Sequence, residues 1–435
     1  MDTYKEALLK HKLVSVWGIG YLGYTEVIRL QSRGFRANVF DCTGARFKEK
    51  ILKNEYPDKE QIHSWSERGN VQKIDPTRII ISDDIHSMFN SNTHVMSFPV
   101  CDRAGRSRLK PLVNHFVKHK DKLAGSLIIF QSVGTPGMIG RDFIDRLEEV
   151  SDCGFVAAFR NDWTIEEFLS GDKGIVLAAN NEESLEKAKL FYDMVGIRFK
   201  TLSSIKEAEL YENARNSFQY ITTVYINQMA LAYHDTDVRT ISEYIIDDVD
   251  LRDAHLSIGA GGYKMPLSVQ NMIDGSRRPD FLTLVREARD TNLSMILTYA
   301  DLVKKERCAS VTLLGISVKG NQKNIEISPS IILAEYLHKL GVRVYIDDPF
   351  FDEMALNEML PFCEKTEIVK DGLNSEALFI MADHDKYKYM TQTDIDKLGI
   401  SNAKIVIDNT TLFKECRFSP STIYHAIGDG RLELL

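Results

Sequence analysis

One short segment near the start of the chain restricts the fold more than any other. It reads Gly-Ile-Gly-Tyr-Leu-Gly at residues 18–23, directly after an apolar run at 13–17. Residues 24–33 follow with helical spacing of their apolar positions, and a second apolar run at 37–41 ends in an aspartate. A strand, a glycine-rich turn, a helix and a second strand in this order predict the first half of a doubly wound α/β fold.

The three glycines of this turn have distinct roles in a dinucleotide site. Gly18 allows the tight turn, Gly20 lets the backbone approach a diphosphate, and Gly23 lets the helix pack against the strand. Asp41 is placed to meet the ribose hydroxyls and would repel a 2′-phosphate, so we expect NAD rather than NADP, although Arg46 weakens that preference. A glycine-rich turn without a ligand is the alternative. The residues expected to contact the cofactor include Gly18, Ile19, Gly20, Tyr21, Leu22, Gly23, Asp41 and Arg46.

Further apolar runs are candidate strands, most of them separated by helical segments. The first series lies at 78–82, 93–97, 126–130, 155–158 and 175–178. It predicts a largely parallel sheet that is covered on both faces. The second series, which predicts a second α/β domain, lies at 311–316, 342–346, 377–381 and 404–408.

Residues 204–234, between the two series, predict one long helix. Its apolar positions recur every three or four residues, at Ala208, Tyr211, Ala214, Phe218, Ile221, Tyr225, Met229 and Ala232. Core packing is the simplest explanation of this stripe. A helix of this length also has more apolar surface than two flanking domains easily cover, so we expect a homodimer built around it.

Composition narrows the class of protein. The formal net charge of −8 gives no long-range attraction for nucleic acid, and we expect no nucleic-acid binding. There is no run of eighteen apolar residues, so we expect no membrane span and a cytoplasmic protein. The six cysteines are scattered singly, and neither a metal site nor a disulfide framework is expected.

A second glycine-rich segment, residues 257–268, reads Ser-Ile-Gly-Ala-Gly-Gly-Tyr-Lys-Met-Pro-Leu-Ser. It resembles the Gly-x-Gly-Gly-x-Cys-x-Pro-Lys-Asp loop of the UDP-glucose/GDP-mannose 6-dehydrogenase family. The resemblance extends in order over almost the whole chain, at 18–23, Ser132 with Pro136-Gly137, 206–210 through Asn216, 259–263 with Pro266, 314–319, 327–329, 345–349, 383–385 and 407–408.

This resemblance implies two Rossmann-like doubly wound domains joined by a long central helix, and a nucleotide-sugar substrate. The implied domains are an NAD-binding domain at 1–200, a central helical and dimerisation region with the glycine-rich loop at 201–305, and a nucleotide-sugar-binding α/β domain at 306–435. It adds Pro99 and Ser132 to the cofactor site. The substrate residues that it implies are Lys206, Arg252, Gly259, Gly261, Gly262 and Lys319.

The departures from the family pattern fall almost entirely on reactive positions. Lys264 stands where the family has its cysteine, and Leu267 and Ser268 replace a lysine and an aspartate. The lysine of the long helix aligns with Glu212, although Asn216 one turn later is kept. Other replaced positions are a general-base glutamate near Arg160 and two substrate arginines at Glu326 and Thr410.

The missing thiol has a direct consequence, because oxidation of an alcohol to an acid needs the intermediate aldehyde to become tetrahedral before a second hydride leaves. Three interpretations remain open. The first is an NAD-dependent oxidoreductase with altered chemistry, in which Lys264, with Asn216, performs acid–base work or polarises a carbonyl. The alternative for Lys264 itself is an exposed loop lysine. The second interpretation is a catalytically inactive NAD- or nucleotide-sugar-binding protein that regulates or scaffolds carbohydrate assembly. The third is an ordinary uronate-forming dehydrogenase with a misaligned site.

Overall fold

The chain folds into two compact α/β units. A computed structural model describes residues 2–42, 44–102, 106–162, 164–248 and 254–431. One unit comprises 1–215 with 274–277, and the other comprises 216–273 with 278–435. The separate central region expected at 201–305 stays a prediction.

The first unit contains an eight-stranded sheet with the order β3-β2-β1-β4-β5-β6-β7-β8. Its strands are β1 (Leu13–Trp17), β2 (Arg36–Phe40), β3 (Ile79–Ile81), β4 (Thr93–Met96), β5 (Leu127–Phe130), β6 (Gly154–Arg160), β7 (Ile175–Ala179) and β8 (Phe199–Thr201). Neighbours pair in parallel except β6 with β7, which are antiparallel. The expected largely parallel sheet is confirmed. The sequence did not indicate β8.

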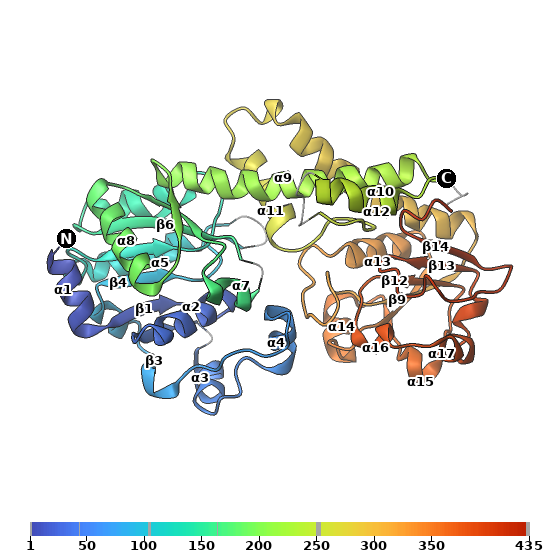
Figure 1. Ribbon diagram of the computed structural model, residues 1–435, viewed down its shortest axis with the longest axis horizontal. Helices are drawn as coiled ribbons and strands as arrows, with labels where there is room; N and C mark the ends of the chain where they lie inside the picture. The colour runs from blue at the N-terminus through green and yellow to red at the C-terminus, as the bar shows by residue number, and fades with distance from the viewer. Residues whose placement is uncertain (1, 43, 103–105, 163, 249–253, 432–435) are drawn as a thin grey trace. The chain divides into compact units, whose positions relative to one another are not determined.

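Helices cover both faces of this sheet (Figure 1). Leu127 and Ile129 of β5 belong to one core together with residues of α1, α2 and α8. Phe130 instead packs on Phe143, with ring centroids 5.2 Å apart, and Phe143 packs on Phe116 of α5 at 5.0 Å. Alternate residues of one strand therefore enter different cores. The helices are α1 (Asp2–His11), α2 (Tyr21–Ser32), α3 (Gly44–Leu52), α4 (Lys59–Trp65), α5 (Leu109–Lys118), α6 (Asp145–Glu148), α7 (Ile165–Ser170) and α8 (Glu182–Val195).

The second unit has a six-stranded, all-parallel sheet with the order β11-β10-β9-β12-β13-β14. Its strands are β9 (Ser310–Leu314), β10 (Arg343–Asp347), β11 (Glu364–Lys365), β12 (Ala377–Ile380), β13 (Ile405–Asp408) and β14 (Ile423–Ala426). The order around β9 repeats the order around β1, so each unit has a point where the strand order reverses. Ligands of such sheets bind at the carboxyl ends of the strands at this point.

The remaining helices surround this second sheet or lead to it. They are α10 (Val238–Asp248), α11 (Lys264–Gly275), α12 (Thr283–Lys305), α13 (Pro329–Lys339), α14 (Glu353–Met359), α15 (Ile368–Asp371), α16 (Asp385–Lys388) and α17 (Gln392–Lys397). Among the described residues, no helix combines the length and apolar character needed to cross a bilayer.

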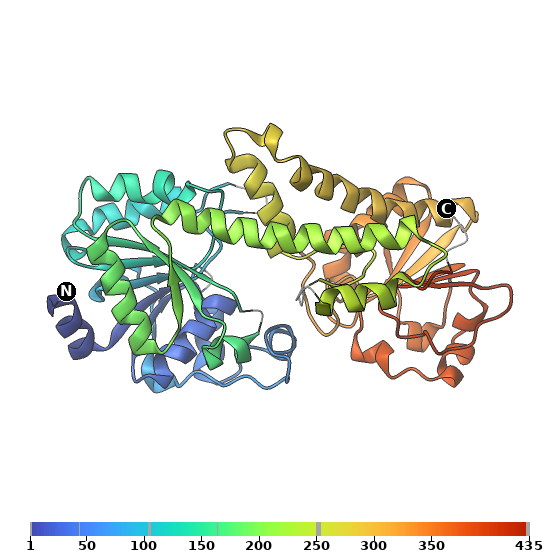
Figure 2. The ribbon, with the colours of Figure 1, turned by 45° about the horizontal axis from the view of Figure 1, so that its top comes forward.

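The predicted long helix is α9 (Ile205–Ala232), which is continuous in Figure 2. Its buried residues include Tyr220 and Val224, which pack with residues of α11 and α12. The prediction that the apolar stripe packs in the core is wrong for three of its aromatic residues. Tyr211 is 38%, Phe218 60% and Tyr225 57% exposed. A spacing of seven residues places these three on one face of the helix.

Candidate functional site

The glycine turn of the first unit has the geometry of a phosphate-binding turn. Gly18 adopts a left-handed φ of 92°, and its N–H donates to the carbonyl of Phe40 at 2.8 Å. A Cβ added at Gly23 would lie 1.9 Å from the carbonyl oxygen of Gly18, so α2 packs too closely for any side chain there. At Gly20 an added Cβ would meet no atom within 4 Å. The turn therefore leaves open space at the N-terminus of α2.

The other predicted cofactor residues lie at the same edge of the sheet. Asp41 follows β2, and its Oδ2 accepts the N–H of Ile19 at 2.9 Å. Pro99 and Ser132 follow β4 and β5, with Pro99 exposed and Ser132 half-buried. The strands β1, β2, β4 and β5 are neighbours, so their carboxyl ends bring these residues to one region. The side chain of Arg46 lies outside the described residues.

Sequence reasoning missed Glu209, a buried carboxylate beside this region. Its side chain accepts the backbone N–H groups of Gly137, at 2.7 Å, and Ile139, at 3.0 Å. Burial raises the pKa of Glu209 to about 7, and the two N–H donors act against that rise. Lys206 lies nearby, with its Cδ 4.0 Å from the position of a Cβ added at Gly137. Glu209 lies in the segment 206–210 that carries the resemblance, but the sequence did not predict its contacts, because its partners come from a distant turn.

Sequence reasoning also missed Asp162. Arg160, the last residue of β6, stands near the position of the family's general base, and its Nε and Nη2 each donate to Asp162 at 2.8 Å. Asp162 also accepts the hydroxyl of Tyr21 at 2.6 Å. The carboxylate of Asp162 is therefore bonded to an arginine and a tyrosine. A general base would instead need contact with the substrate.

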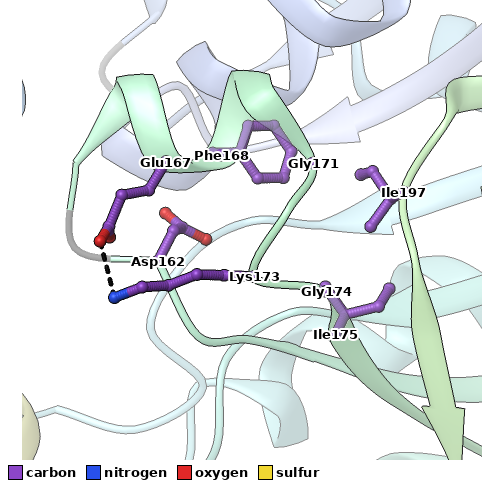
Figure 3. Close-up of a pocket in the computed structure, with 8 residues that line it drawn as sticks. All are labelled: Asp162, Glu167, Phe168, Gly171, Lys173, Gly174, Ile175 and Ile197. Atoms are coloured by element: carbon purple, nitrogen blue, oxygen red, sulfur yellow. Dashed lines mark ion pairs between the residues drawn. The ribbon is translucent and has the colours of Figure 1, made fainter.

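Asp162 also lines a small pocket (Figure 3). Its cavity volume is about 10 Å³, room for about one water molecule, and an ion pair of 2.6 Å joins Lys173 and Glu167 of its lining. None of the predicted site residues lines it. Its lining residues are Asp162, Glu167, Phe168, Gly171, Lys173, Gly174, Ile175 and Ile197.

The second glycine-rich segment is fixed by close backbone packing within the second unit. A Cβ added at Gly259 would lie 2.6 Å from Cγ1 of Ile296, and one at Gly261 would lie 2.5 Å from Cδ of Pro329. Gly262 has a φ of 93°, and its N–H donates to the carbonyl of Glu326 at 2.9 Å. These glycines are needed for packing, whether or not the loop binds a substrate.

Lys264 begins helix α11, directly after this segment, and is half-buried. Ser268 follows one turn later, and its Oγ accepts Nδ2 of Asn216 at 3.1 Å. The structure thus brings together the two predicted catalytic segments, since Asn216 contacts the helix that starts at Lys264.

The remaining predicted residues have varied surroundings. Glu212 is buried and forms an ion pair of 3.1 Å with Arg215. Thr410 donates its N–H and hydroxyl to Oδ1 of Asp408, each at 2.9 Å. Lys319 is exposed after β9, and Arg252 lies outside the described residues. In the part of the chain that the structure describes, no three His, Cys, Asp or Glu side chains cluster in a way that would hold a metal ion.

Comparisons with known proteins agree with this architecture. Residues 312–415 match the UDP-glucose/GDP-mannose dehydrogenase family, UDP binding domain. The UDP-N-acetyl-D-mannosamine dehydrogenase of Methanocaldococcus jannaschii is 22% identical over 97% of this chain and 97% of its own. The UDP-glucose 6-dehydrogenase YwqF of Bacillus subtilis is 23% identical over 85% of this chain and 87% of its own.

Solved structures share the fold. The UDP-D-ManNAc dehydrogenase of Pyrococcus horikoshii has a TM-score of 0.74 at 20% identity, over 96% of this chain and 100% of that one. A UDP-glucose dehydrogenase of Pyrobaculum islandicum has a TM-score of 0.75 at 18% identity, over 96% and 97%. The ordered motifs, the matched domain and relatives that span both units lead to one conclusion: residues 312–415 match the UDP binding domain of the UDP-glucose/GDP-mannose dehydrogenase family, and the chain as a whole is similar to nucleotide-sugar dehydrogenases in sequence and in fold.

Proposed function

We propose that the protein is an NAD-dependent oxidoreductase that acts on a CH–OH group of a nucleotide sugar, with chemistry altered by the loss of the family's cysteine. The open space at Gly20, next to a helix N-terminus and Asp41, is the observation that carries the cofactor part. Backbone N–H groups at that N-terminus suit a diphosphate. Bound NAD would supply the hydride acceptor. The carboxylate of Asp41 supports NAD over a cofactor with a 2′-phosphate.

The altered chemistry is supported by the position of the thiols. Cys153 and Cys308 flank a long stretch without cysteine, and both are buried. Burial raises the pKa of Cys153 to about 12 and that of Cys308 to about 11, so neither is a reactive thiolate near neutral pH. Without a thiohemiacetal, we expect a two-electron step between alcohol and aldehyde or a redox-neutral change at the sugar. Lys264 Nζ is our candidate to hold or accept the hydroxyl proton, with Asn216 orienting the substrate.

A second candidate is a binding protein without catalysis. The polar groups that could replace the family's reactive residues are already engaged with protein partners, since Glu212 pairs with Arg215 and the amide of Asn216 with Ser268. A nucleotide-sugar-binding protein without catalysis would keep the glycines, because the packing requires them. Its polar side chains would be able to bond to one another, as Glu212 does with Arg215.

We also propose that the protein is a homodimer. The exposed aromatic face of α9, formed by Tyr211, Phe218 and Tyr225, is the kind of surface that monomers rarely leave uncovered. A two-fold axis beside α9 would pair this face with its own copy.

Incubation of the protein with UDP-glucose and NAD, followed by chromatography of nucleotide sugars, tests the proposed chemistry. We expect no uronate with two NADH per sugar, because the second hydride lacks its covalent intermediate and Glu326 stands where the family holds the substrate with an arginine. Uronate formation above about 1 per second, the low end of typical enzyme rates, would contradict the altered chemistry. Mass spectrometry of ligands released from the purified protein would separate the enzyme from the binder by identifying bound sugar nucleotides and products.

A further inference from the structure

The first turn of α2 lacks the local groups that usually anchor a helix start. Its N-cap is Gly20, which offers no side chain, and the first turn carries no acidic residue. Such caps normally satisfy the first N–H groups and fix the entry of the chain. Their absence suits an anionic ligand, but it leaves the position of the turn to be fixed by something else.

Arg160, the last residue of β6, and Asp162, two residues later, hold the start of α2 through other groups. The hydroxyl of Tyr21, the first residue of α2, donates to Asp162 at 2.6 Å. Nη1 of Arg160 donates to Oγ1 of Thr25 at 2.7 Å and to the carbonyl of Leu22 at 3.2 Å. The first two turns of α2 are thus tied at three points to the end of a strand far along the chain.

The two anchoring residues are themselves rigidly held. Arg160 and Asp162 are 3% and 4% exposed and share a two-pronged ion pair. The guanidinium of Arg160 lies 3.4 Å from the ring centroid of Phe168 on α7, which Figure 3 shows with Asp162. Arg160 also balances the charge of Asp162, which would otherwise repel an anion at the N-terminus of α2.

We propose that Arg160, Asp162 and the Tyr21 hydroxyl are positioning residues, which hold the first turn of α2 where its N–H groups can bind the diphosphate of the dinucleotide. This inference rests on the proposed NAD site. It assigns a role to the position where the family's general base is lost. In this proposal the clamp, meaning these three groups, acts on the diphosphate through the backbone of Gly20 to Gly23, and the side-chain hydroxyl of Tyr21 is used for the bond to Asp162.

Binding of ligand fragments separates positioning from plain stabilisation. NAD and ADP-ribose contain the diphosphate, whereas adenosine does not. We would measure their dissociation constants for the wild type, Tyr21→Phe and Arg160→Met, by calorimetry for the first two ligands and by ligand-observed NMR for adenosine. We expect Tyr21→Phe to raise the dissociation constants of NAD and ADP-ribose roughly tenfold, which is the effect of losing one charge-assisted hydrogen bond. Arg160→Met should raise these two dissociation constants further. The dissociation constant of adenosine should change by no more than about twofold in either variant, because only the diphosphate contacts the displaced turn.

Arg29 provides the matched control. It is 3% exposed, lies 5.8 Å from the ring of Phe168, and donates to the carbonyls of Leu169 and Gly196 at the other end of α2. Arg29→Met should lower the melting temperature and leave the affinity for NAD unchanged.

The outcomes are distinguishable. If wild-type protein binds neither NAD nor ADP-ribose, the proposed function and the clamp both fail. If the wild-type protein binds NAD and ADP-ribose and Tyr21→Phe binds them equally well, the clamp proposal is refuted and the proposed function stands. Tyr21→Phe alone decides this if Arg160→Met does not fold. Equal weakening of adenosine and ADP-ribose, or equal weakening by Arg29→Met, would mean general loosening of the domain and would also overturn the clamp.

Discussion

Gly20→Val is the substitution that most directly tests where the diphosphate binds. A Cβ at position 20 meets no atom within 4 Å, and Gly20 has an ordinary φ of −66°. We expect a stability cost below about 1 kcal/mol, because the less favourable N-cap residue is offset by the lower entropy of the unfolded chain. The same side chain would occupy the space into which a diphosphate must fit.

Thermal unfolding with and without NAD is the assay. Ligand at one hundred times its dissociation constant stabilises the folded state by about 2.7 kcal/mol. At roughly 2–4 °C per kcal/mol for a domain of this size, the wild type should gain about 5–10 °C. Gly20→Val should melt near the wild type without NAD and gain nothing from it.

Two comparisons sharpen this test. Gly140→Val adds a side chain where a Cβ also meets nothing within 4 Å, outside the predicted site, and should keep the full shift. Gly23→Ala should unfold far below the wild type, because its Cβ would lie 1.9 Å from a backbone oxygen. A Gly20→Val protein that retains the shift would refute the placement of the diphosphate, as would calorimetry that finds no NAD binding to the wild type at millimolar concentration.

Two other predictions concern stability and assembly. Because the folded-state pKa of Glu209 is raised from 4.5 to about 7, the folded protein keeps a proton there that the unfolded chain has lost. Unfolding free energy should therefore fall by on the order of 3 kcal/mol as pH rises from 4.5 through 7, and denaturant titrations of Glu209→Gln should lack this decline. Sedimentation at micromolar concentration should show a dimer that Phe218→Glu with Tyr225→Glu converts to monomer, and a wild type that sediments only at 49.5 kDa would disprove the homodimer.

The sequence by itself determined most strands of the two sheets and the glycine-rich turn at residues 18–23; it did not indicate β8, β11 and β14. Apolar runs, helical periodicity and the glycines at 18, 20 and 23 are local signals, and each acts within a few residues of the chain. They predicted β1, α2 and β2 in this order along the chain, the bounds of α9 within two residues, and the placement of Asp41 beside the turn. The sequence alone also gave the prediction that Lys264 stands where the resembling loop has a cysteine, because residue identities can be compared without a fold.

Only the tertiary structure decided which polar groups meet. Tyr21 and Asp162 are 141 residues apart in the chain, and Gly137 and Glu209 are 72 apart. No periodicity links such pairs, because sheet order and helix packing bring them together. The same reason explains the aromatic face of α9: spacing identified an apolar stripe, but whether Phe218 is covered depends on which neighbours pack beside the helix. Burial likewise raised the pKa of Glu209, through desolvation that only a folded interior provides.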